Sequence, residues 1–181
     1  MKAPQEISTV RLVLALPRPG DADEIFERYA SDPDVTTYLG WPGHRSVDET
    51  RAFLAFSASE WERWPAGPYL IRDRSDGRLL GGTGLGFQST DRAITGYVLA
   101  RDAWGRGYAT EALAAMVELA RALGVVHLSA LCHPKHRASW RVLEKCGFTR
   151  SAESPQVEFP NLSPGELQPA MRYELVLTLS R

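Results

Sequence analysis

The sequence has few cysteines, no long apolar run and no excess of charge of one sign. Two cysteines among 181 residues are too few for a disulfide framework, so we expect a reducing, cytoplasmic location. The sequence contains no continuous apolar stretch of the length that a signal peptide or a membrane span requires, so we predict no membrane association. The formal net charge of −1 and the lack of an arginine-rich block argue against a nucleic-acid binder.

Two common nucleotide-binding motifs are also missing. A Walker loop requires Gly-x-x-x-x-Gly-Lys-Ser/Thr, which this sequence does not contain. The dinucleotide-binding fingerprint requires a third small residue, but Thr110 stands there in one glycine-rich stretch and Phe87 in the other. The sequence therefore disfavours a nucleotide-dependent oxidoreductase built on these glycines.

The sequence does contain a β-prone run that leads through two glycines into an amphipathic helix. Gly105 and Gly107 lie in the turn, and apolar residues recur at helical spacing from Ala109 onward. The first N–H groups of a helix are unpaired and partly positive, and glycine lets a ligand approach the backbone closely. We therefore predict a site for a phosphate or pyrophosphate here, with Arg101 and Arg106 adding positive charge.

The same stretch resembles the acyl-CoA-binding motif of the Gcn5-related N-acetyltransferases (GNAT), and most closely their RimJ/RimL-like branch of ribosomal-protein acetyltransferases. The resemblance runs from Trp104 to Ala112, while Asp102 stands where the general motif has Gln or Arg. It implies that acetyl-CoA is the cosubstrate. It also implies that the cofactor is bound by Val98, Leu99, Ala100, Arg101, Trp104, Gly105, Arg106, Gly107, Tyr108, Ala109 and Thr110.

A second block resembles the branch pattern Pro-x-Asn-x-x-Ser-x-x-Val-Leu-x-Lys-x-Gly-Phe. His136 stands at the Asn position, and the matching residues are Ser139, Val142, Leu143, Lys145, Gly147 and Phe148. The resemblance implies that Ser139 gives a proton to the leaving thiolate, and that His136, Ser139 and Lys145 contact the cofactor. The alternative for Ser139 is an ordinary serine that caps a helix.

The implied reaction is the attack of a free amine on a thioester carbonyl. The developing oxyanion needs a fixed donor, and the backbone N–H of Leu99 or Ala100 is the candidate. The amine must lose a proton to a carboxylate, an imidazole or water. The sequence leaves this base open among His44, Glu158, His133 and, through water, Asp102.

No metal site is predicted. Cys132, His133 and His136 are close in sequence, but they lack a convincing fourth ligand. Both cysteines of the chain are expected to be small core residues.

The resemblance implies that two segments lie over the acceptor. One contains Tyr38, Trp41 and His44, and the other contains Glu158 and Phe159. Since Glu158 is the only carboxylate among them, we expect the acceptor to be a peptide N-terminus or a small-molecule amine beside an apolar group, rather than a polycation. A non-catalytic acyl-CoA-binding module is the alternative, and the oligomeric state stays open, with a homodimer as one option.

The patterns predict one N-acetyltransferase domain over residues 1–181. Strands are expected at 9–14, 69–73, 78–87, 93–99, 125–132 and 172–179, and helices after Asp21, after Ser46, after the glycine turn as far as Gly124, and at 138–145. The resemblance implies an α/β (α+β) fold with a mixed, mainly antiparallel sheet, flanked by helices, whose splayed strands hold acetyl-CoA.

Overall fold

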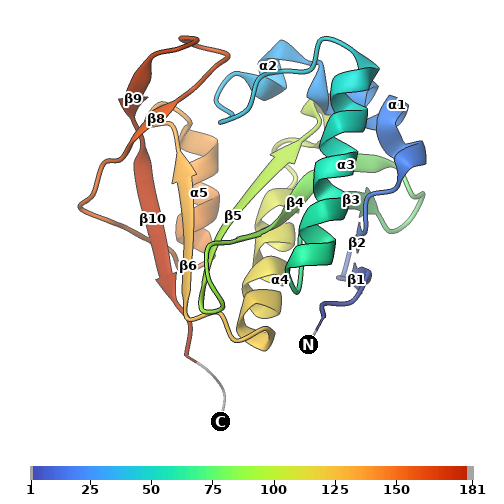
Figure 1. Ribbon diagram of the computed structural model, residues 1–181. Coiled ribbons are helices and arrows are strands. Elements are labelled where there is room, and N and C mark those ends of the chain that lie inside the picture. Colours follow the sequence, from blue (N-terminus) through green and yellow to red (C-terminus); the bar gives the residue numbers. More distant parts are fainter. Residues whose placement is uncertain (1, 179–181) are drawn as a thin grey trace.

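An eight-stranded sheet runs through the computed structural model, which describes residues 2–178 (Figure 1). Its strand order is β1-β2-β3-β4-β5-β6-β10-β7, and every neighbouring pair is antiparallel except β5 with β6. The strands are β1 (Glu6–Ser8), β2 (Leu12–Ala15), β3 (Pro68–Asp73), β4 (Leu79–Phe87), β5 (Arg92–Leu99), β6 (His127–Cys132), β7 (Thr149–Arg150) and β10 (Met171–Val176). A separate hairpin joins β8 (Gln156–Glu158) to β9 (Leu167–Pro169). The predicted mixed, mainly antiparallel sheet is confirmed.

Helices cover both faces of this sheet. In Figure 1, α3 (Val47–Arg63) lies in front of it, whereas α4 (Tyr108–Ala122) and α5 (Arg137–Lys145) lie behind it. The chain reaches α3 through a series of short turns: η1 (Pro19–Asp21), α1 (Ala22–Ile25), the π-helical turn η2 (Phe26–Ala30) and α2 (Pro33–Thr36). Within residues 2–178, no helix has both the length and the apolar character that a membrane span needs.

Two apolar clusters follow from this layering. The larger one contains the buried stripe of α4, with Leu113 and Met116 fully inaccessible, as the helical spacing predicts. The smaller one lies under α1 and η2. Because side chains alternate along a strand, the end of β5 contributes to both: Leu99 belongs to the larger cluster, and Val98 and Ala100 pack in the smaller one.

The two central strands separate after a short contact. β5 and β6 pair in parallel only where Arg92–Ile94 lies opposite His127–Ser129. Beyond Ile94, β5 pairs with β4 alone, and beyond Ser129, β6 pairs with β10 alone. One edge of β5 therefore faces an opening between the two strands, which is the predicted splay.

The glycine-rich strand β4 has a structural explanation. A Cβ atom on Gly81 would overlap the carbonyl oxygen of Val98, and one on Gly84 would lie 2.8 Å from the Cα atom of Pro68. These glycines allow the neighbouring strands to approach closely, so this stretch is not a second ligand site.

Some local predictions are corrected by the structure. The strand expected at 9–14 begins only at Leu12, because residues 9–11 form the turn between β1 and β2, where the Thr9 N–H donates to the Leu12 carbonyl oxygen. Asp21 and Ser46 precede helices as predicted, but neither side chain caps its helix. The last strand ends at Val176, and the predicted residues beyond 178 lie outside the described part of the chain.

Glu111 in the first turn of α4 joins this helix to the start of β2. One carboxylate oxygen accepts from the Thr9 hydroxyl at 2.6 Å and from the Arg11 N–H at 2.8 Å, and the other accepts from Arg11 Nε at 2.7 Å. Burial raises the pKa of Glu111, but these hydrogen bonds and the charge of Arg11 outweigh burial, so the net effect is a lowered pKa. The carboxylate therefore stabilises the contact in its ionised form.

We predict that Glu111→Gln lowers the free energy of unfolding by about 1–2 kcal/mol at pH 7, a value reduced because Arg11 is partly exposed. Because the folded-state pKa of Glu111 is lowered, its contribution is present above the unfolded-state pKa and is lost as the pH falls through the folded-state pKa. Urea unfolding of both proteins should therefore show a smaller difference in acid. Glu118→Gln on the exposed face of α4 is the control, and an equal loss in that variant would contradict the role of Glu111.

Candidate active site

The turn between β5 and α4 has the backbone geometry of an anion site. Gly105 and Gly107 have φ angles of 71° and 78°, which favour glycine. Gly107 is the N-cap residue of α4, and no side chain caps this helix. Within residues 2–178, the N–H groups from Gly105 to Thr110 donate no hydrogen bond to the protein. These open donors at the positive end of a 15-residue helix fit a phosphate or pyrophosphate.

Two side chains fix the shape of this turn. Trp104 Nε1 donates to the Leu99 carbonyl oxygen at 2.9 Å, which folds the turn back onto the end of β5. Arg11 Nη1 donates to the Arg106 carbonyl oxygen at 2.8 Å, and its guanidinium lies 4.7 Å from the centre of the buried Tyr108 ring. The donor array is therefore held in place by protein contacts before any ligand arrives.

The charges around the turn differ from the prediction. Arg101 forms ion pairs with Asp32 at 2.8 Å and with Asp34 at 3.0 Å, so its charge is offset by two carboxylates beside α2. The expectation that Arg101 supplies free positive charge to an anion is wrong for this reason. Arg106 is exposed and forms no ion pair within residues 2–178, so it keeps that role.

The end of β5 supplies one free backbone donor. The Ala100 N–H donates to the Leu80 carbonyl oxygen at 2.8 Å, so it does not serve as the predicted oxyanion donor. Hydrogen bonding alternates along an antiparallel strand, so the N–H and C=O of Leu99 point to the other edge, where β6 has separated. The indole N–H of Trp104 donates to that carbonyl oxygen, so the Leu99 N–H is the group that remains directed into the opening.

Ser139 lies in the first turn of α5, on the other side of this opening. The Tyr97 hydroxyl donates to the Ser139 carbonyl oxygen at 2.7 Å and lies 3.1 Å from Ser139 Oγ. Burial raises the pKa of Tyr97, so its phenol stays protonated at neutral pH. Tyr97 was not among the predicted site residues, although its place two residues before Leu99 puts both side chains on one face of β5.

The ends of α5 face different parts of the site. His136 is the N-cap residue, and its ring stacks on Tyr38 with 5.0 Å between centroids, so it faces the loop after α2. Lys145 is exposed at the other end, beside Cys146, whose Sγ lies 3.5 Å from the Thr110 carbonyl oxygen. The C-terminal end of α5 therefore lies beside the start of α4, where the glycine turn ends.

Of the residues considered as the base, His44 has the most suitable surroundings. Its Nδ1 lies 2.8 Å from the hydroxyl of the fully buried Thr50, and its ring lies 5.3 Å from that of Trp41. Its Nε2 makes no hydrogen bond within residues 2–178. Burial lowers the pKa of His44, and the charge of Glu49 opposes part of this shift, so the ring is neutral at neutral pH.

The other three base candidates are held by contacts of their own. His133 Nδ1 accepts the Lys135 N–H at 3.1 Å, and the His133 ring is buried. Glu158 is exposed, and its carboxylate accepts a backbone N–H of the β8–β9 loop at 2.9 Å, so it stabilises the hairpin. Asp102 is held by two arginines at 2.8 and 3.1 Å. These contacts favour His44 among the four candidates.

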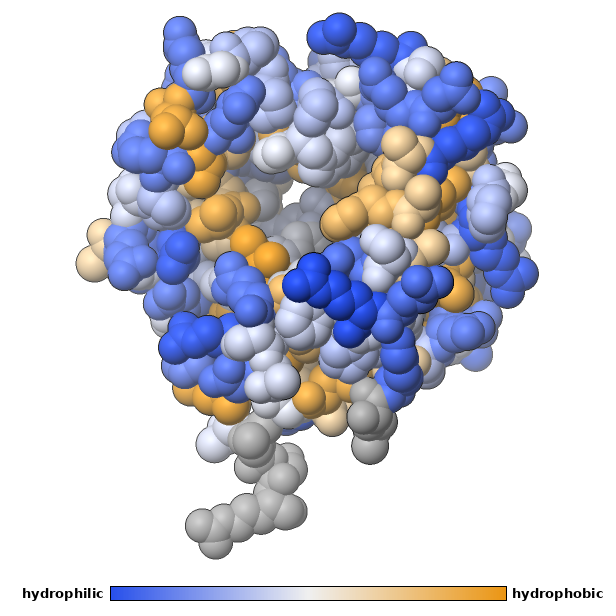
Figure 2. All heavy atoms as spheres, in the orientation of Figure 1, coloured by the Kyte–Doolittle hydropathy of each residue, from blue (hydrophilic) through white to orange (hydrophobic). Residues whose placement is uncertain are grey.

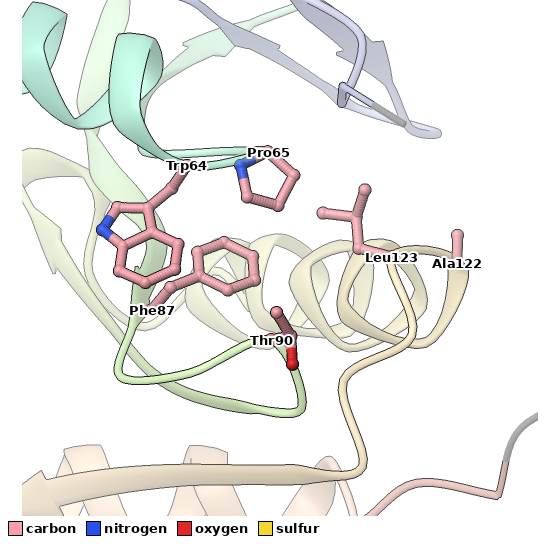
Figure 3. A pocket seen from close by; sticks show the side chains of 6 residues that line it. All are labelled: Trp64, Pro65, Phe87, Thr90, Ala122 and Leu123. Atoms are coloured by element: carbon pink, nitrogen blue, oxygen red, sulfur yellow. The ribbon is translucent and has the colours of Figure 1, made fainter.

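A separate depression of about 300 Å³ lies at the other end of β5 (Figure 3). None of the residues that line it is titratable: Trp64, Pro65, Phe87, Thr90, Ala122 and Leu123. Within residues 2–178, no three His, Cys, Asp or Glu side chains are grouped so that they could hold a metal ion. The candidate active site is therefore the opening between β5 and β6.

Comparison with known proteins assigns the chain to a family. Residues 11–149 match the acetyltransferase (GNAT) domain, and the chain belongs to this family. It is 30% identical to the uncharacterized protein YkkB of Bacillus subtilis (strain 168) over 82% of this chain and 87% of YkkB. It is 27% identical to the uncharacterized N-acetyltransferase YoaA of the same strain, over 87% of this chain and 90% of YoaA.

A solved structure shows the same fold. The ribosomal L7/L12 alpha-N-protein acetyltransferase RimL, in complex with coenzyme A, superposes with a TM-score of 0.82 at 21% identity. The match covers 95% of this chain and 98% of that chain. The predicted family, fold and enzyme class, an acetyltransferase, are confirmed by these comparisons.

We predict that Gly105→Ala weakens the binding of CoA by about tenfold or more, because the new methyl group stands in front of the open N–H groups. Gly124→Ala is a matched control: both glycines have positive φ, 71° and 81°, and a Cβ at either would meet no protein atom within 4 Å. Gly124 lies beyond the far end of α4. Calorimetric titration with CoA compares the two variants, and equal affinities would contradict the anion site.

Proposed function

We propose that this chain is an acetyl-CoA-dependent N-acetyltransferase that transfers the acetyl group directly to a primary amine, either at a peptide or protein N-terminus or on a small molecule. The observation that carries this proposal is the opening between β5 and β6. Open N–H groups from Gly105 to Thr110 lie at one end of it, the Leu99 N–H points to the unpaired edge of β5, and the Ser139–Tyr97 hydroxyl pair lies beside the same strand.

The residues present fit the elongated, phosphorylated CoA molecule. The glycine turn would hold the pyrophosphate through backbone N–H groups, with Arg106 beside it. The free edge of β5 would hold the amide groups of the pantetheine arm, since that edge has lost its partner strand beyond Ile94. RimL, which has the same fold, has been solved in complex with coenzyme A.

The chemistry follows from how this chain places its donors. When bound, acetyl-CoA supplies a thioester whose carbonyl carbon is open to attack. The fixed Leu99 N–H would stabilise the negative charge that develops on the carbonyl oxygen. Ser139 Oγ would give a proton to the departing sulfur, and the Tyr97 hydroxyl, which donates to the Ser139 carbonyl oxygen and lies 3.1 Å from Oγ, would position that serine.

His44 would take up the proton of the attacking amine. The neutral ring has a free Nε2 when Nδ1–H donates to the Thr50 hydroxyl. Trp41 lies beside His44 and packs in the same cluster as Val98, so both residues stand on the α1–α3 side of the sheet. The amine is therefore proposed to enter from that side, opposite to Ser139.

The surroundings of the amine support an acceptor with apolar or aromatic neighbours. Tyr38, Trp41 and Phe159 contribute aromatic rings, while Glu158 is used within its hairpin. A polycation would require several free carboxylates.

We also propose membership of the RimJ/RimL-like branch, supported by the fold of RimL, and a cytoplasmic location, supported by two unpaired cysteines.

A panel of amines tests this function. Wild-type protein with acetyl-CoA is expected to release thiol with short peptides bearing free N-terminal amines, and to do so faster than with spermine. Background rates for every amine would favour a non-catalytic module that binds acyl-CoA.

Ser139→Ala is predicted to lower kcat by about a hundredfold. Its affinity for CoA should stay within about twofold, because a proton donor acts in the transition state. Ser59→Ala in α3 is the control for losing a hydroxyl.

His44→Gln is predicted to change the pH profile of the reaction. Because burial lowers the pKa of His44, the wild-type rate should fall only when the pH drops below about 6.5, the ordinary value for histidine. The variant should be slower at pH 7 by about tenfold or more and should lack that acid limb. The ionisation of the acceptor amine is common to both proteins and cancels in their ratio. His127→Gln at the exposed start of β6 is the control. An unchanged acid limb in His44→Gln would exclude His44 as the base.

A further inference from the structure

Two segments that are far apart in the sequence meet above the opening between β5 and β6. Asn161, in the loop of the β8–β9 hairpin, contacts the loop that follows α2. Its Nδ2 donates to the carbonyl oxygens of Thr36 at 2.7 Å and Trp41 at 2.9 Å, and its Oδ1 accepts the Gly43 N–H at 2.8 Å. One side-chain amide thus bonds three backbone groups, one at the end of α2 and two in the loop that follows it.

Aromatic stacking fixes the same loop at a second point. The Tyr38 ring stacks on both His133 and His136, with centroid distances of 4.9 and 5.0 Å. Phe159 contacts the His133 ring edge-on at 4.7 Å. The loop after α2 is therefore joined to the turn between β6 and α5, as well as to the hairpin.

The other end of the loop lies on the α1–α3 side of the sheet, because Trp41 packs against the same cluster as Val98 of β5. With β5 and β6 apart below it, the loop completes a ring around the opening. Figure 2, in the orientation of Figure 1, shows a hollow in this face of the molecule between the two halves of the sheet. Asn161 provides the hydrogen-bonded link of this ring.

The ring presents aromatic and uncharged groups. Burial lowers the pKa of His44, His133 and His136, so their imidazoles are neutral at neutral pH. Tyr38 and Trp41 add aromatic surface. Such a lining favours an apolar chain and disfavours a second charge close to the reacting amine.

We propose that Asn161 is a positioning residue that closes this ring, and that the closed ring limits the width of the body that carries the reacting primary amine. The proposal rests on the proposed function, since it specifies the acceptor of the same site. An amine carried directly on a wide body would need the loop after α2 to move away, and the contacts of Asn161 oppose that movement.

The first test measures the link itself, without substrate. In Asn161→Ala, the backbone amide of Gly43 should exchange with solvent at least about tenfold faster than in the wild-type protein. Asn161→Asp has nearly the same shape, but it places oxygen against the Thr36 and Trp41 carbonyls, so it should also loosen the loop. Glu166→Ala in the same hairpin loop is the control, because its side chain makes no hydrogen bond or ion pair within residues 2–178. Unchanged exchange of Gly43 in both Asn161 variants would overturn the proposal.

The second test measures the width of the acceptor. Butylamine, phenethylamine and adamantylmethylamine each carry a primary amine on a CH₂ group, with bodies of increasing width. The wild-type kcat/KM should fall sharply for the adamantyl compound, and Asn161→Ala should recover about tenfold of that loss while its affinity for CoA is unchanged. An identical width profile in wild type and Asn161→Ala would overturn the proposal even if the loop is looser.

The two proposals fail in different ways. If no amine is acetylated, the proposed function fails. The width limit can then still be measured, by calorimetric titration of the same three amines into the CoA-saturated protein. Width-dependent binding that relaxes in Asn161→Ala would then support the ring. Binding of none of the series, or binding without regard to width, would overturn it. Acetylation with a width limit that does not depend on Asn161 leaves the function intact and removes the role of Asn161.

Discussion

The separation of β5 from β6 is the constraint on which the rest of the site depends. The N–H and C=O groups of a strand in the middle of a sheet ordinarily form hydrogen bonds with both neighbouring strands. β5 pairs with both neighbours only as far as Ile94. Beyond that residue, one edge of β5 needs another partner. Trp104 takes the Leu99 carbonyl, which still leaves the Leu99 N–H open. The strand thus presents fixed donors whose counterpart is an extended polar ligand, and no cavity lined by apolar side chains is needed to bind it.

An opening in the middle of a sheet must be stabilised by its surroundings. On one side, β4 holds β5 along its whole length, and its glycines allow this close approach. On the other side, β10 pairs with all of β6. Above the opening, Asn161 and the Tyr38 stack connect the two halves again. Each of the two separated strands is therefore held by its outer neighbour in the sheet. The binding geometry exists before ligand arrives.

Local features of the sequence were sufficient to predict the donor turn, but not the charges around it. Gly105 and Gly107 adopt positive φ, and the apolar spacing of α4 places Leu113 and Met116 in the core, because both properties depend on neighbouring residues in the chain. The pairing of Arg101 with Asp32 depends on how α2 packs beside the short turn η3 (Arg101–Ala103), which no local pattern specifies. The use of the Ala100 N–H by Leu80 depends on the register of β4 and β5. Asn161 stands in a proline-rich segment whose hairpin was not predicted. The spacing of residues in the sequence could therefore not predict its contact with a loop 120 positions away.

The alternation of side chains along β5 explains how the two proposed proton-transfer groups can act on one thioester and its amine without meeting each other. Tyr97 and Leu99 point toward α4 and α5, where Ser139 lies, while Val98 and Ala100 point toward α1 and α3, where Trp41 and His44 lie. A nucleophile must approach a carbonyl carbon on one side, and the leaving group departs from another. In the proposed mechanism the sheet separates His44, which would receive a proton from the amine, from Ser139, which would give one to the thiolate. Burial shifts the pKa of His44 down and that of Tyr97 up, and in both cases it favours the neutral form, so His44 can accept a proton and the Tyr97 hydroxyl can hold the Ser139 carbonyl oxygen.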